Sequence, residues 1–368
     1  MKIKDVKVQV IKRDIEVSGG AQFTQGGISF LDKWIEIPVL RIITDEGIEG
    51  ASFGFSGKEL APHLISLKPL LLGEDPLFRE ELWHKLWEQS RMLFIPPPVL
   101  SMIDVALWDI GGKVANLPIY QLLGAYREKV RAYASSPIFS SVEEYVDKVL
   151  EYKARGFIAS KLHVPCIPSK DLEICRAVRK AVGDDMLLML DPVGAYDREQ
   201  ALMVGRELEK LNFYWYEEPI SDFDISGLTQ LCRDLDIPIA SLEVLPGSLY
   251  TRAQYIARGA VDIVRSDTMY NGGITSLKKI ASLAEAFGLK CEIHANTNPL
   301  MSAANLHVTC SIKNCDFYEC IMAEEITEFG VKQGIKIDNE GYAHVPKGPG
   351  LGMEVDWEYI DGHTIATL

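Results

Sequence analysis

The sequence predicts an α/β fold, namely a (β/α)7β TIM-like barrel with an α+β capping domain. Three observations support this prediction. The first 50 residues have the alternating pattern of antiparallel strands, the middle of the chain alternates short apolar segments with amphipathic helical segments, and residues 330–368 contain no further βα unit. We expect residues 1–125 to form the capping domain, residues 126–325 the barrel, and residues 326–368 a segment that returns to the cap. A chain of 368 residues is long enough for this arrangement.

The capping domain is predicted from a change of periodicity along the first third of the chain. Residues 2–11 alternate charged and β-branched side chains, residues 34–43 are apolar and extended, and residues 48–55 form a third such run. The glycine-rich loop 19–30 between the first two strands is expected to be a mobile lid. From residue 58 to 124 the period becomes helical, so strands and helices are segregated as in an α+β domain.

Eight apolar segments of strand length predict the barrel. They are residues 131–135, 157–164, 186–191, 213–217, 238–243, 261–267, 290–294 and 316–320. Amphipathic stretches such as residues 171–183 and 274–288 lie between them. This regular alternation favours a parallel barrel over an open doubly wound sheet. No GxGxxG motif follows the first strand, which argues against a dinucleotide-binding fold.

Composition argues against several classes of partner. The formal net charge of −14 disfavours nucleic acid and anionic membrane surfaces, but it allows an anionic small substrate because a bound divalent cation can reverse the local field. The seven cysteines are odd in number and form no CxxC pair, which is typical of free thiols in a reducing compartment. The N-terminus has no apolar signal-peptide core, and no uncharged run approaches the length of a membrane span. We therefore expect a cytoplasmic protein, with a symmetric homo-oligomer as the default assembly.

Polar residues at the predicted strand ends are the candidates for a functional site. In a parallel barrel, catalytic side chains come from the carboxyl ends of several strands at once. From the second strand to the eighth, these positions are occupied by Lys161 and His163, Asp191, Glu217, Glu243, Asp267, His294 and Glu319. From Asp191 onward they recur every 24 to 27 residues, which is one βα repeat each time. The side chains should therefore meet at one rim of the barrel.

The residue types indicate a metal site beside groups that can move protons. Asp191, Glu217 and Glu243 form an all-oxygen donor set on three adjacent strands, which suits Mg²⁺. Lys161 and His163 are two residues apart on one strand, so they point to the same face. This arrangement predicts that the proton-moving groups lie across the barrel from the carboxylates.

A second candidate pair lies on the other side of the carboxylates. Asp267 is one strand away from His294 and could hold its imidazole in one tautomer and raise its basicity. Taken singly, an acidic residue at a strand end is more often a helix cap, Lys161 could be a structural ion-pair partner, and His163 could be a hydrogen-bonded barrel histidine. The prediction of a functional site rests on the whole set of strand-end residues. Buried charges must be paired, so charged residues at the ends of so many successive strands are not expected by chance.

Two groups of polar residues are predicted to lie outside the site. Glu218 follows Glu217 directly and is expected to point away from the face that Glu217 occupies. The remaining histidines lie on predicted helices or terminal segments and are assigned no role: His63, His84, His307, His344 and His363.

Motifs along the chain carry a family resemblance. They are Ala106-Leu107-Trp108-Asp109 with Gly112-Lys113, Pro118 and Leu122-Leu123-Gly124; Tyr216-Glu217-Glu218-Pro219; Ser266-Asp267 with Asn271-Gly272-Gly273-Ile274-Thr275; and Pro349-Gly350-Leu351-Gly352 before Glu354-Val355-Asp356. They resemble, in this order, the cap–barrel joint, the second metal-ligand segment, the dyad-aspartate segment and the tail of the enolase superfamily. The chain is thus similar to the mandelate racemase/muconate lactonizing enzyme group, in its mandelate racemase branch and its acid-sugar dehydratase-like members.

The resemblance implies a role for each strand-end residue. It implies that the three carboxylates are the ligands of a Mg²⁺ cofactor and that His294 and Asp267 form an acid/base dyad. It also implies that Glu319 hydrogen-bonds the substrate carboxylate. The loop 19–30 and the segment Phe53–Gly57 would close over the substrate. Enzymes of this superfamily use a Lys or His base together with Mg²⁺, which stabilises an ene-diolate, so the resemblance implies the same chemistry here.

The sequence departs from the family pattern at two places. The second strand commonly carries Lys-x-Lys, whereas this chain has Lys161-Leu162-His163, so His163 occupies the position of the base. Lys161 matches the first lysine, which tunes the base and touches the substrate. The first metal ligand is often followed by x-Asn, whereas here Asp191 is followed by Pro192-Val193. These differences bear on the substrate rather than on metal binding.

The hypothesis from the sequence is a Mg²⁺-dependent lyase that removes the proton next to a carboxylate. The favoured reaction is dehydration of a sugar acid, an aldonate or aldarate, to a 2-keto-3-deoxy acid. One alternative is a racemase, epimerase or cycloisomerase acting on a 2-hydroxy carboxylate. The alternative of another class is a catalytically idle protein that binds acid sugars. The sequence does not identify the sugar acid, because a fold can host many specificities.

Overall fold

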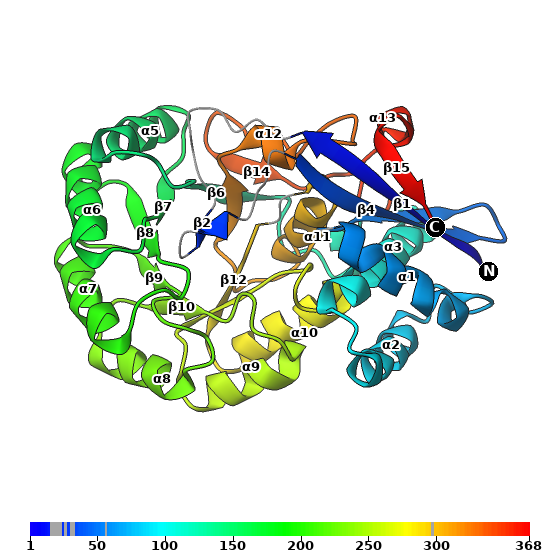
Figure 1. Ribbon diagram of the computed structural model, residues 1–368, viewed down its shortest axis with the longest axis horizontal. Coiled ribbons are helices and arrows are strands. Elements are labelled where there is room, and N and C mark those ends of the chain that lie inside the picture. The colour runs from blue at the N-terminus through cyan, green and yellow to red at the C-terminus, as the bar shows by residue number, and fades with distance from the viewer. Residues whose placement is uncertain (15–23, 26–27, 30–33, 56, 296–297) are drawn as a thin grey trace.

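The structure is a computed structural model that describes residues 1–14, 24–25, 28–29, 34–55, 57–295 and 298–368. It has two parts side by side, a barrel surrounded by helices and a cap of strands and helices that also holds both chain termini (Figure 1). The predicted fold class, an α/β barrel with an α+β cap, is confirmed. Within the described ranges, no helix has the length and apolar character needed to cross a bilayer.

The cap is built on an antiparallel sheet with the order β15-β1-β4-β5. Its strands are β1 (Ile3–Asp14), β4 (Trp34–Thr44), β5 (Glu49–Phe53) and β15 (Thr364–Thr367), and its helices are α1 (Gly57–Leu71), α2 (Arg79–Leu93), α3 (Pro97–Ala115) and α4 (Ile119–Leu122). The alternation in β1 buries Val6, Val8 and Val10 on one face, as period two requires. Most of the predicted lid, residues 19–30, lies outside the described residues, apart from the short strands β2 (Thr24–Gln25) and β3 (Ile28–Ser29).

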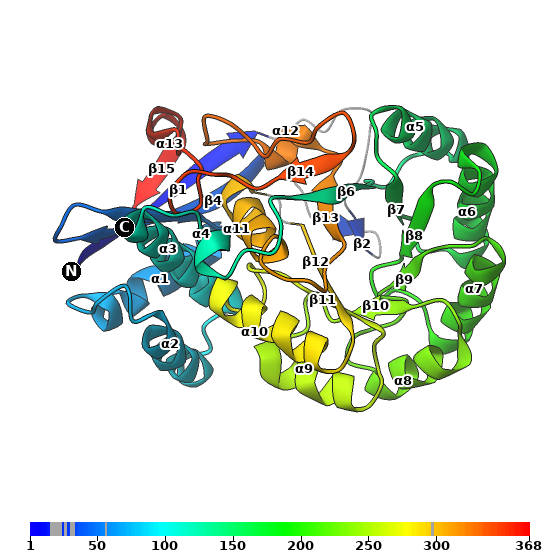
Figure 2. The ribbon, with the colours of Figure 1, turned by 180° about the vertical axis from the view of Figure 1, so that it is seen from behind.

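The barrel strands are parallel and lie in the order β12-β11-β10-β9-β8-β7-β6-β13. They are β6 (Lys129–Ser135), β7 (Ala159–His163), β8 (Leu187–Asp191), β9 (Trp215–Glu217), β10 (Ile239–Ser241), β11 (Ile263–Ser266), β12 (Lys290–Ile293) and β13 (Phe317–Ile321). The helices of the outer ring are α5 (Val142–Ala154), α6 (Pro168–Val182), α7 (Arg198–Lys210), α8 (Ile225–Asp234), α9 (Ser248–Ala257), α10 (Gly273–Ala286) and α11 (Pro299–Thr309). Figure 2 shows the same ring from behind, with α10 next to the cap.

The chain beyond the barrel contacts both parts of the molecule. After α12 (Glu324–Thr327), strand β14 (Tyr342–His344) pairs antiparallel with β6 of the barrel. The helix α13 (Trp357–His363) then leads into β15, which pairs antiparallel with β1 of the cap. This segment therefore fastens the cap to the barrel.

Helix α3 forms the centre of the joint between cap and barrel. It is buried along most of its length. Asp104 on this helix accepts hydrogen bonds from the backbone N–H of Thr275 at 3.0 Å and from its hydroxyl at 2.6 Å. Asp109 accepts from the backbone N–H groups of Ala51 and Leu351, at 3.1 and 3.0 Å. Carboxylates that are removed from water need such donors, so α3 fixes the cap against the strand ends of the barrel.

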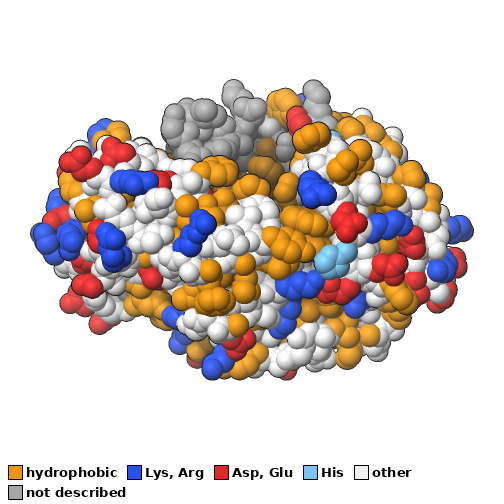
Figure 3. Space-filling view, turned by 90° about the horizontal axis from the view of Figure 1, so that it is seen from below, with side chains coloured by type: hydrophobic (Ala, Val, Ile, Leu, Met, Phe, Trp, Pro, Cys, Tyr) orange, Lys and Arg blue, Asp and Glu red, His pale blue; other side chains and the backbone are white. Residues whose placement is uncertain are grey.

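The barrel interior is arranged in layers that place charge near one end. The lower layer is apolar and consists of Tyr133, Ala159, Met189, Trp215, Ala240, Ile263 and Phe317. Two residues further along four of these strands lie the buried side chains of Lys161, Glu217, Arg265 and Glu319. The apolar layer therefore fills the barrel interior beneath the charged layer, and the charged layer lies next to the carboxyl ends of the strands. On the outer surface, Figure 3 shows acidic and basic side chains interspersed with apolar ones.

Candidate active site

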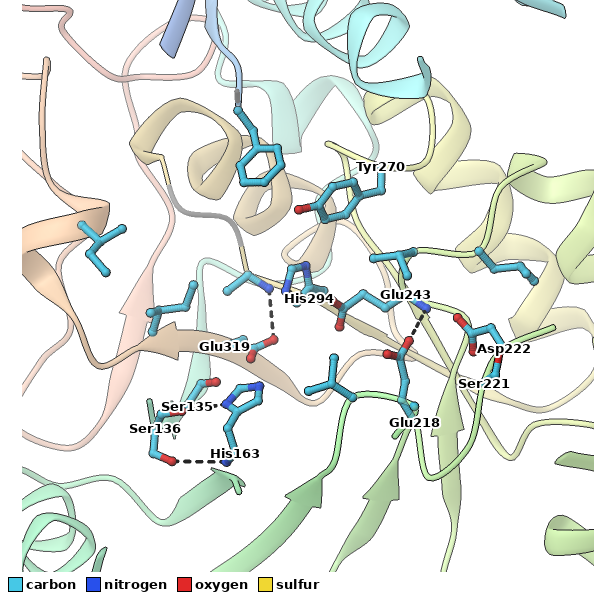
Figure 4. A pocket seen from close by; sticks show the side chains of 18 of the residues that line it. Ser135, Ser136, His163, Glu218, Ser221, Asp222, Glu243, Tyr270, His294 and Glu319 are labelled. Carbon is cyan, nitrogen blue, oxygen red and sulfur yellow. Dashed lines mark hydrogen bonds and ion pairs between the residues drawn. The ribbon is translucent and has the colours of Figure 1, made fainter. Parts of the chain in front are cut away.

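A cavity of about 410 Å³ lies at the carboxyl ends of the barrel strands. Its polar lining includes His163 at the end of β7, Glu218 after β9, Glu243 after β10, His294 after β12 and Glu319 on β13. Figure 4 shows these side chains converging on the cavity from different strands. The cap contributes Phe55, whose ring meets Tyr270 edge to face. Four of the predicted strand-end residues therefore line the cavity, namely His163, Glu243, His294 and Glu319.

Lys161 is the centre of the charged layer. Its ammonium lies 2.9 Å from Glu217 Oε1, 3.0 Å from Asp191 Oδ2 and 3.0 Å from Glu319 Oε1, and the side chain is only 1% exposed. Burial opposes the charge, but the surrounding carboxylates outweigh it and hold the pKa of Lys161 well above its ordinary value. Lys161 is therefore a buried cation shared by three carboxylates.

Arg265 is a second buried cation, at a position for which the sequence predicted no role. Its Nε donates to Glu217 Oε1 at 2.8 Å and its Nη2 donates to Glu319 Oε2 at 2.7 Å. The residue precedes Asp267 by two positions on the same predicted strand, so period-two alternation alone could have placed it on the inner face. Because removing one partner of a buried ion pair leaves an uncompensated charge, Arg265 and Glu217 depend on each other.

Glu319 accepts hydrogen bonds from three sides. Its donors are Lys161, Arg265 and, at 3.0 Å, the backbone N–H of Ala295. Burial would raise the pKa of this carboxyl, but Lys161 and Arg265 hold it well below its usual range. Glu319 is therefore an ionised carboxylate, and in this arrangement it has no proton to donate to a substrate.

The three predicted metal ligands each face a cation. Asp191 contacts Lys161 and lies 3.2 Å from His163 Nε2, Glu217 is held by Lys161 and Arg265, and Glu243 Oε1 lies 3.2 Å from a ring nitrogen of His294. Among the described residues, no three His, Cys, Asp or Glu side chains are gathered into a group that could hold a metal ion. Asp191 and Glu217 are the last residues of β8 and β9, whereas Glu243 lies two residues beyond the end of β10. The side chains of all three pair with neighbouring cations.

The chemistry of this rim still fits a divalent cation. Burial raises the pKa of Glu243 to about 7, with the neighbouring Glu217 adding to the effect and His294 opposing it. Burial, together with Asp222 and Glu243, raises the pKa of Glu218 well above its usual range. Carboxylates thus crowd together at this end of β9 and β10, and their hard oxygen atoms are the ligands that Mg²⁺ prefers.

The predicted dyad is in direct contact. His294 Nδ1 lies 3.0 Å from Asp267 Oδ2, and the other Asp267 oxygen accepts the backbone N–H of Tyr270 at 2.7 Å. A carboxylate can only accept, so Nδ1 carries the proton and Nε2 faces the cavity. Burial opposes protonation of the ring, but Glu243 and Asp267 raise the pKa of His294 to about 9. The imidazolium is therefore the dominant form at neutral pH.

His163 is oriented by a backbone carbonyl. Its Nδ1 lies 2.6 Å from the carbonyl oxygen of Ser136, which can only accept, so Nδ1 is protonated. Its Nε2 is then directed towards Asp191. Burial opposes the charge, yet Asp191 raises the pKa of His163 above its ordinary value. In Figure 4, Glu319 lies between His163 and His294, so the two rings approach the cavity from different sides.

The prediction for Glu218 is wrong. The strand alternation predicts that it points away from the face of Glu217, but Glu218 lines the cavity, and its Oε1 accepts the backbone N–H of Glu243 at 3.1 Å. Strand β9 ends at Glu217, and Glu218 has a left-handed φ of 37°. The alternation of faces holds only within the extended strand, so this turn redirects the side chain.

Comparisons with known proteins agree with this architecture. Residues 35–124 match the family model for the mandelate racemase/muconate lactonizing enzyme N-terminal domain, and residues 144–359 match the model for the enolase C-terminal domain-like family. The chain is 33% identical over 335 residues to arabinonate dehydratase of Saccharolobus solfataricus, covering 87% of this chain and 88% of that protein. It is 35% identical over 272 residues to L-talarate/galactarate dehydratase of Salmonella typhimurium, covering 71% and 68% of the two chains.

A solved structure shows the same fold over the whole chain. It is D-glucarate dehydratase from Agrobacterium tumefaciens complexed with magnesium, with a TM-score of 0.90, 35% identity and full coverage of both chains. The resemblance drawn from the sequence motifs is thereby confirmed. The chain belongs to the mandelate racemase/muconate lactonizing enzyme group of the enolase superfamily.

Proposed function

We propose that this protein is a Mg²⁺-dependent hydro-lyase that dehydrates an aldonate or aldarate to a 2-keto-3-deoxy acid. The observation that carries the proposal is the His294–Asp267 dyad, which faces the cavity beside a rim of carboxylates. Relatives at 33% and 35% identity that are named arabinonate dehydratase and L-talarate/galactarate dehydratase support the reaction class.

Asp191, Glu217 and Glu243 are the residues that would hold Mg²⁺. When bound, the ion would act as a Lewis acid that polarises the substrate carboxylate and makes the neighbouring proton more acidic. Lys161 is buried and contacts the first two of these carboxylates, so we assign it to holding them in place. We assign Glu319 to holding Lys161 and Arg265, because an ionised carboxylate cannot donate a hydrogen bond.

The dehydration needs a base at C2 and an acid at the C3 hydroxyl. The C2–H bond breaks as the base takes the proton, a C2–C3 double bond forms, and the C3–O bond breaks as the hydroxyl leaves as water with a proton from the acid. His294, protonated at neutral pH and fixed by Asp267, suits the acid. The enol product then becomes the keto acid. The base must be an imidazole in its neutral form, and the configuration at C2 decides whether it is His163 or the unprotonated fraction of His294.

A panel of acid sugars in D₂O tests the proposal. The purified protein is incubated with Mg²⁺ and mono- and diacid sugars, the 2-keto acid is assayed, and the C2 proton is followed by NMR. We expect keto acid from one stereochemical series. Formation of no keto acid from any member, with Mg²⁺ shown to bind, would count against dehydration of aldonates and aldarates.

Racemisation or epimerisation is the second candidate, and one observation favours it. His163 and His294 enter the cavity from different sides, each with Nδ1 held by an acceptor and Nε2 next to a carboxylate of the rim. Two such groups could exchange one proton across a single carbon atom. The same D₂O experiment separates the reactions, since deuterium at C2 without keto acid would select this alternative.

A further inference from the structure

The segment that carries Glu243 has an unusual backbone. Strand β10 ends at Ser241, and the next residue, Leu242, has a left-handed φ of 88°. A branched side chain is sterically disfavoured in this conformation, so surrounding contacts must enforce it. The turn directs Glu243 towards the cavity, where its carboxylate meets His294.

Arg252 holds the carbonyl groups of this turn. It lies on α9, is fully buried, and donates from Nη2 to the carbonyl oxygen of Leu242. Its Nη1 donates to the carbonyl oxygens of Leu245 at 2.7 Å and Ser248 at 3.1 Å. A single guanidinium therefore gathers carbonyl groups from both ends of the turn.

Three other side chains complete the enclosure of the turn. Asp222 Oδ1 accepts the backbone N–H of Leu242 at 3.2 Å, and Glu218 Oε1 accepts that of Glu243 at 3.1 Å. From the other side, Asn271 Nδ2 donates to the carbonyl oxygen of Glu243 at 3.0 Å. The N–H and C=O groups of both residues are thus satisfied by side chains rather than by a neighbouring strand.

We propose that Arg252 is a positioning residue that fixes the left-handed turn at Leu242 and thereby presents Glu243 to the metal. This inference rests on the proposed role of Glu243 as a Mg²⁺ ligand. Arg252 acts on the backbone of the ligand rather than on its carboxylate. Residues that orient metal ligands from behind typically change metal affinity by about 10- to 100-fold when they are replaced.

The variant Arg252→Gln tests the proposal, with Mg²⁺ affinity measured by isothermal titration calorimetry on the full chain. The matched control is Arg179→Gln. Arg179 is also buried and donates to the carbonyl oxygens of Leu211, Gly183, Met186 and Asn212, but it lies before the start of β8, away from the cavity. We expect Arg252→Gln to weaken Mg²⁺ binding about 10- to 100-fold and Arg179→Gln to change it less than about twofold.

Two further variants separate positioning from loss of folding. Arg252→Lys keeps the charge and part of the hydrogen bonding, so it should bind Mg²⁺ with intermediate affinity. Adding Leu242→Gly to Arg252→Gln should restore part of the affinity, because glycine adopts a positive φ without steric cost. Saturating Mg²⁺ should also restore turnover of Arg252→Gln, whereas a misfolded protein would stay inactive.

Wild-type affinity in folded Arg252→Gln or Arg252→Lys would overturn the inference. The variant Glu243→Gln distinguishes this failure from failure of the proposed function. If Glu243→Gln weakens Mg²⁺ binding and the Arg252 variants do not, only the positioning role is wrong. If Glu243→Gln also binds Mg²⁺ like the wild type, the proposed metal site is wrong, and the positioning role of Arg252 is then wrong as well.

Discussion

Individual side chains decide the chemistry at the rim of the barrel, and His294 is the one on which the proposed reaction depends most. We predict that His294→Asn lowers kcat by about 10²- to 10⁴-fold, because the acid of the elimination is lost. Mg²⁺ affinity, measured by calorimetry, should stay within an order of magnitude of the wild type.

A second histidine–aspartate pair provides the matched control. His344 Nε2 lies 2.7 Å from Asp338 Oδ2 on the segment that follows the barrel, and the described lining of the cavity includes neither residue. His344→Asn should leave kcat unchanged. Near-normal turnover by His294→Asn with Mg²⁺ bound would contradict the assigned role.

Sequence periodicity predicted most of the charged residues at the strand ends, but it did not predict a role for Arg265 within β11 or the direction of Glu218 after β9. The repeat of one βα unit was enough to bring His294 and Asp267 together, because both lie at the ends of adjacent parallel strands. Glu218 was misplaced because its φ of 37° ends the alternation. The pairing of Glu217 with Lys161 and Arg265 depends on side-chain geometry within the barrel, which spacing along the chain does not encode.

At the scale of elements, the hydroxyl of Thr275 joins α10 of the barrel to α3 of the cap. Thr275 donates to the buried Asp104 at 2.6 Å and accepts from the indole N–H of Trp108 at 2.8 Å. We predict that Thr275→Val lowers the free energy of unfolding by about 2 kcal/mol, because the buried Asp104 and the half-buried Trp108 each lose a hydrogen bond. Thr229→Val is the control, since the Thr229 hydroxyl donates to the carbonyl of Ile225 within α8. Equal losses in denaturant unfolding would contradict a special role for this joint.

His307 makes the packing of α11 sensitive to pH. Its Nδ1 accepts the backbone N–H of Tyr120 at 3.2 Å and its Nε2 donates to the carbonyl oxygen of Leu351 at 3.0 Å, so the ring must be neutral. Burial lowers the pKa of His307 to about 4. Between this pH and the unfolded value of about 6.5, the unfolded chain binds more protons. The stability contributed by the neutral ring is therefore complete above about pH 6.5 and is lost as the pH falls through this window.

Replacing the ring tests this linkage. Relative to His307→Gln, the wild type should lose about 3 kcal/mol more in free energy of unfolding between pH 7 and pH 4. Urea unfolding of both proteins at several pH values measures the difference, and effects of other titrating groups cancel in it. Parallel pH profiles would show that His307 is not neutral in the folded state.

Element positions were predictable wherever apolar segments are bounded by turn residues. The predicted segments 186–191 and 290–294 coincide closely with β8 and β12. The predicted strand 238–243 is shortened to Ile239–Ser241 because Leu242 turns out of the sheet. The antiparallel addition of β14 to β6 was not predicted, since it joins residues about 200 positions apart and short strands carry little local signal.

For the whole molecule, the order of strands and helices was sufficient to predict the barrel and its cap. Short apolar strands that alternate with amphipathic helices form a parallel barrel, whereas the strands at the start of the chain have no helices between them and form a separate antiparallel sheet. The return of the chain end to β1 through β15 completes the cap sheet. The order of strands and helices does not predict the substrate, because substrate choice depends on the shape of the cavity.

Metal-dependent loss of the C2 proton is the central step of the proposed dehydration, and it can be followed with and without Mg²⁺. The wild-type protein, stripped of divalent ions with EDTA, is mixed in D₂O with the sugar acid that gives the strongest response, and NMR is recorded before and after Mg²⁺ is added in excess. We expect that the C2 proton signal persists in EDTA and disappears, with formation of the 2-keto-3-deoxy acid, once Mg²⁺ is present. Turnover that continues unchanged in EDTA, or a C2 proton retained in every sugar acid with Mg²⁺ bound, would contradict the proposed dehydration.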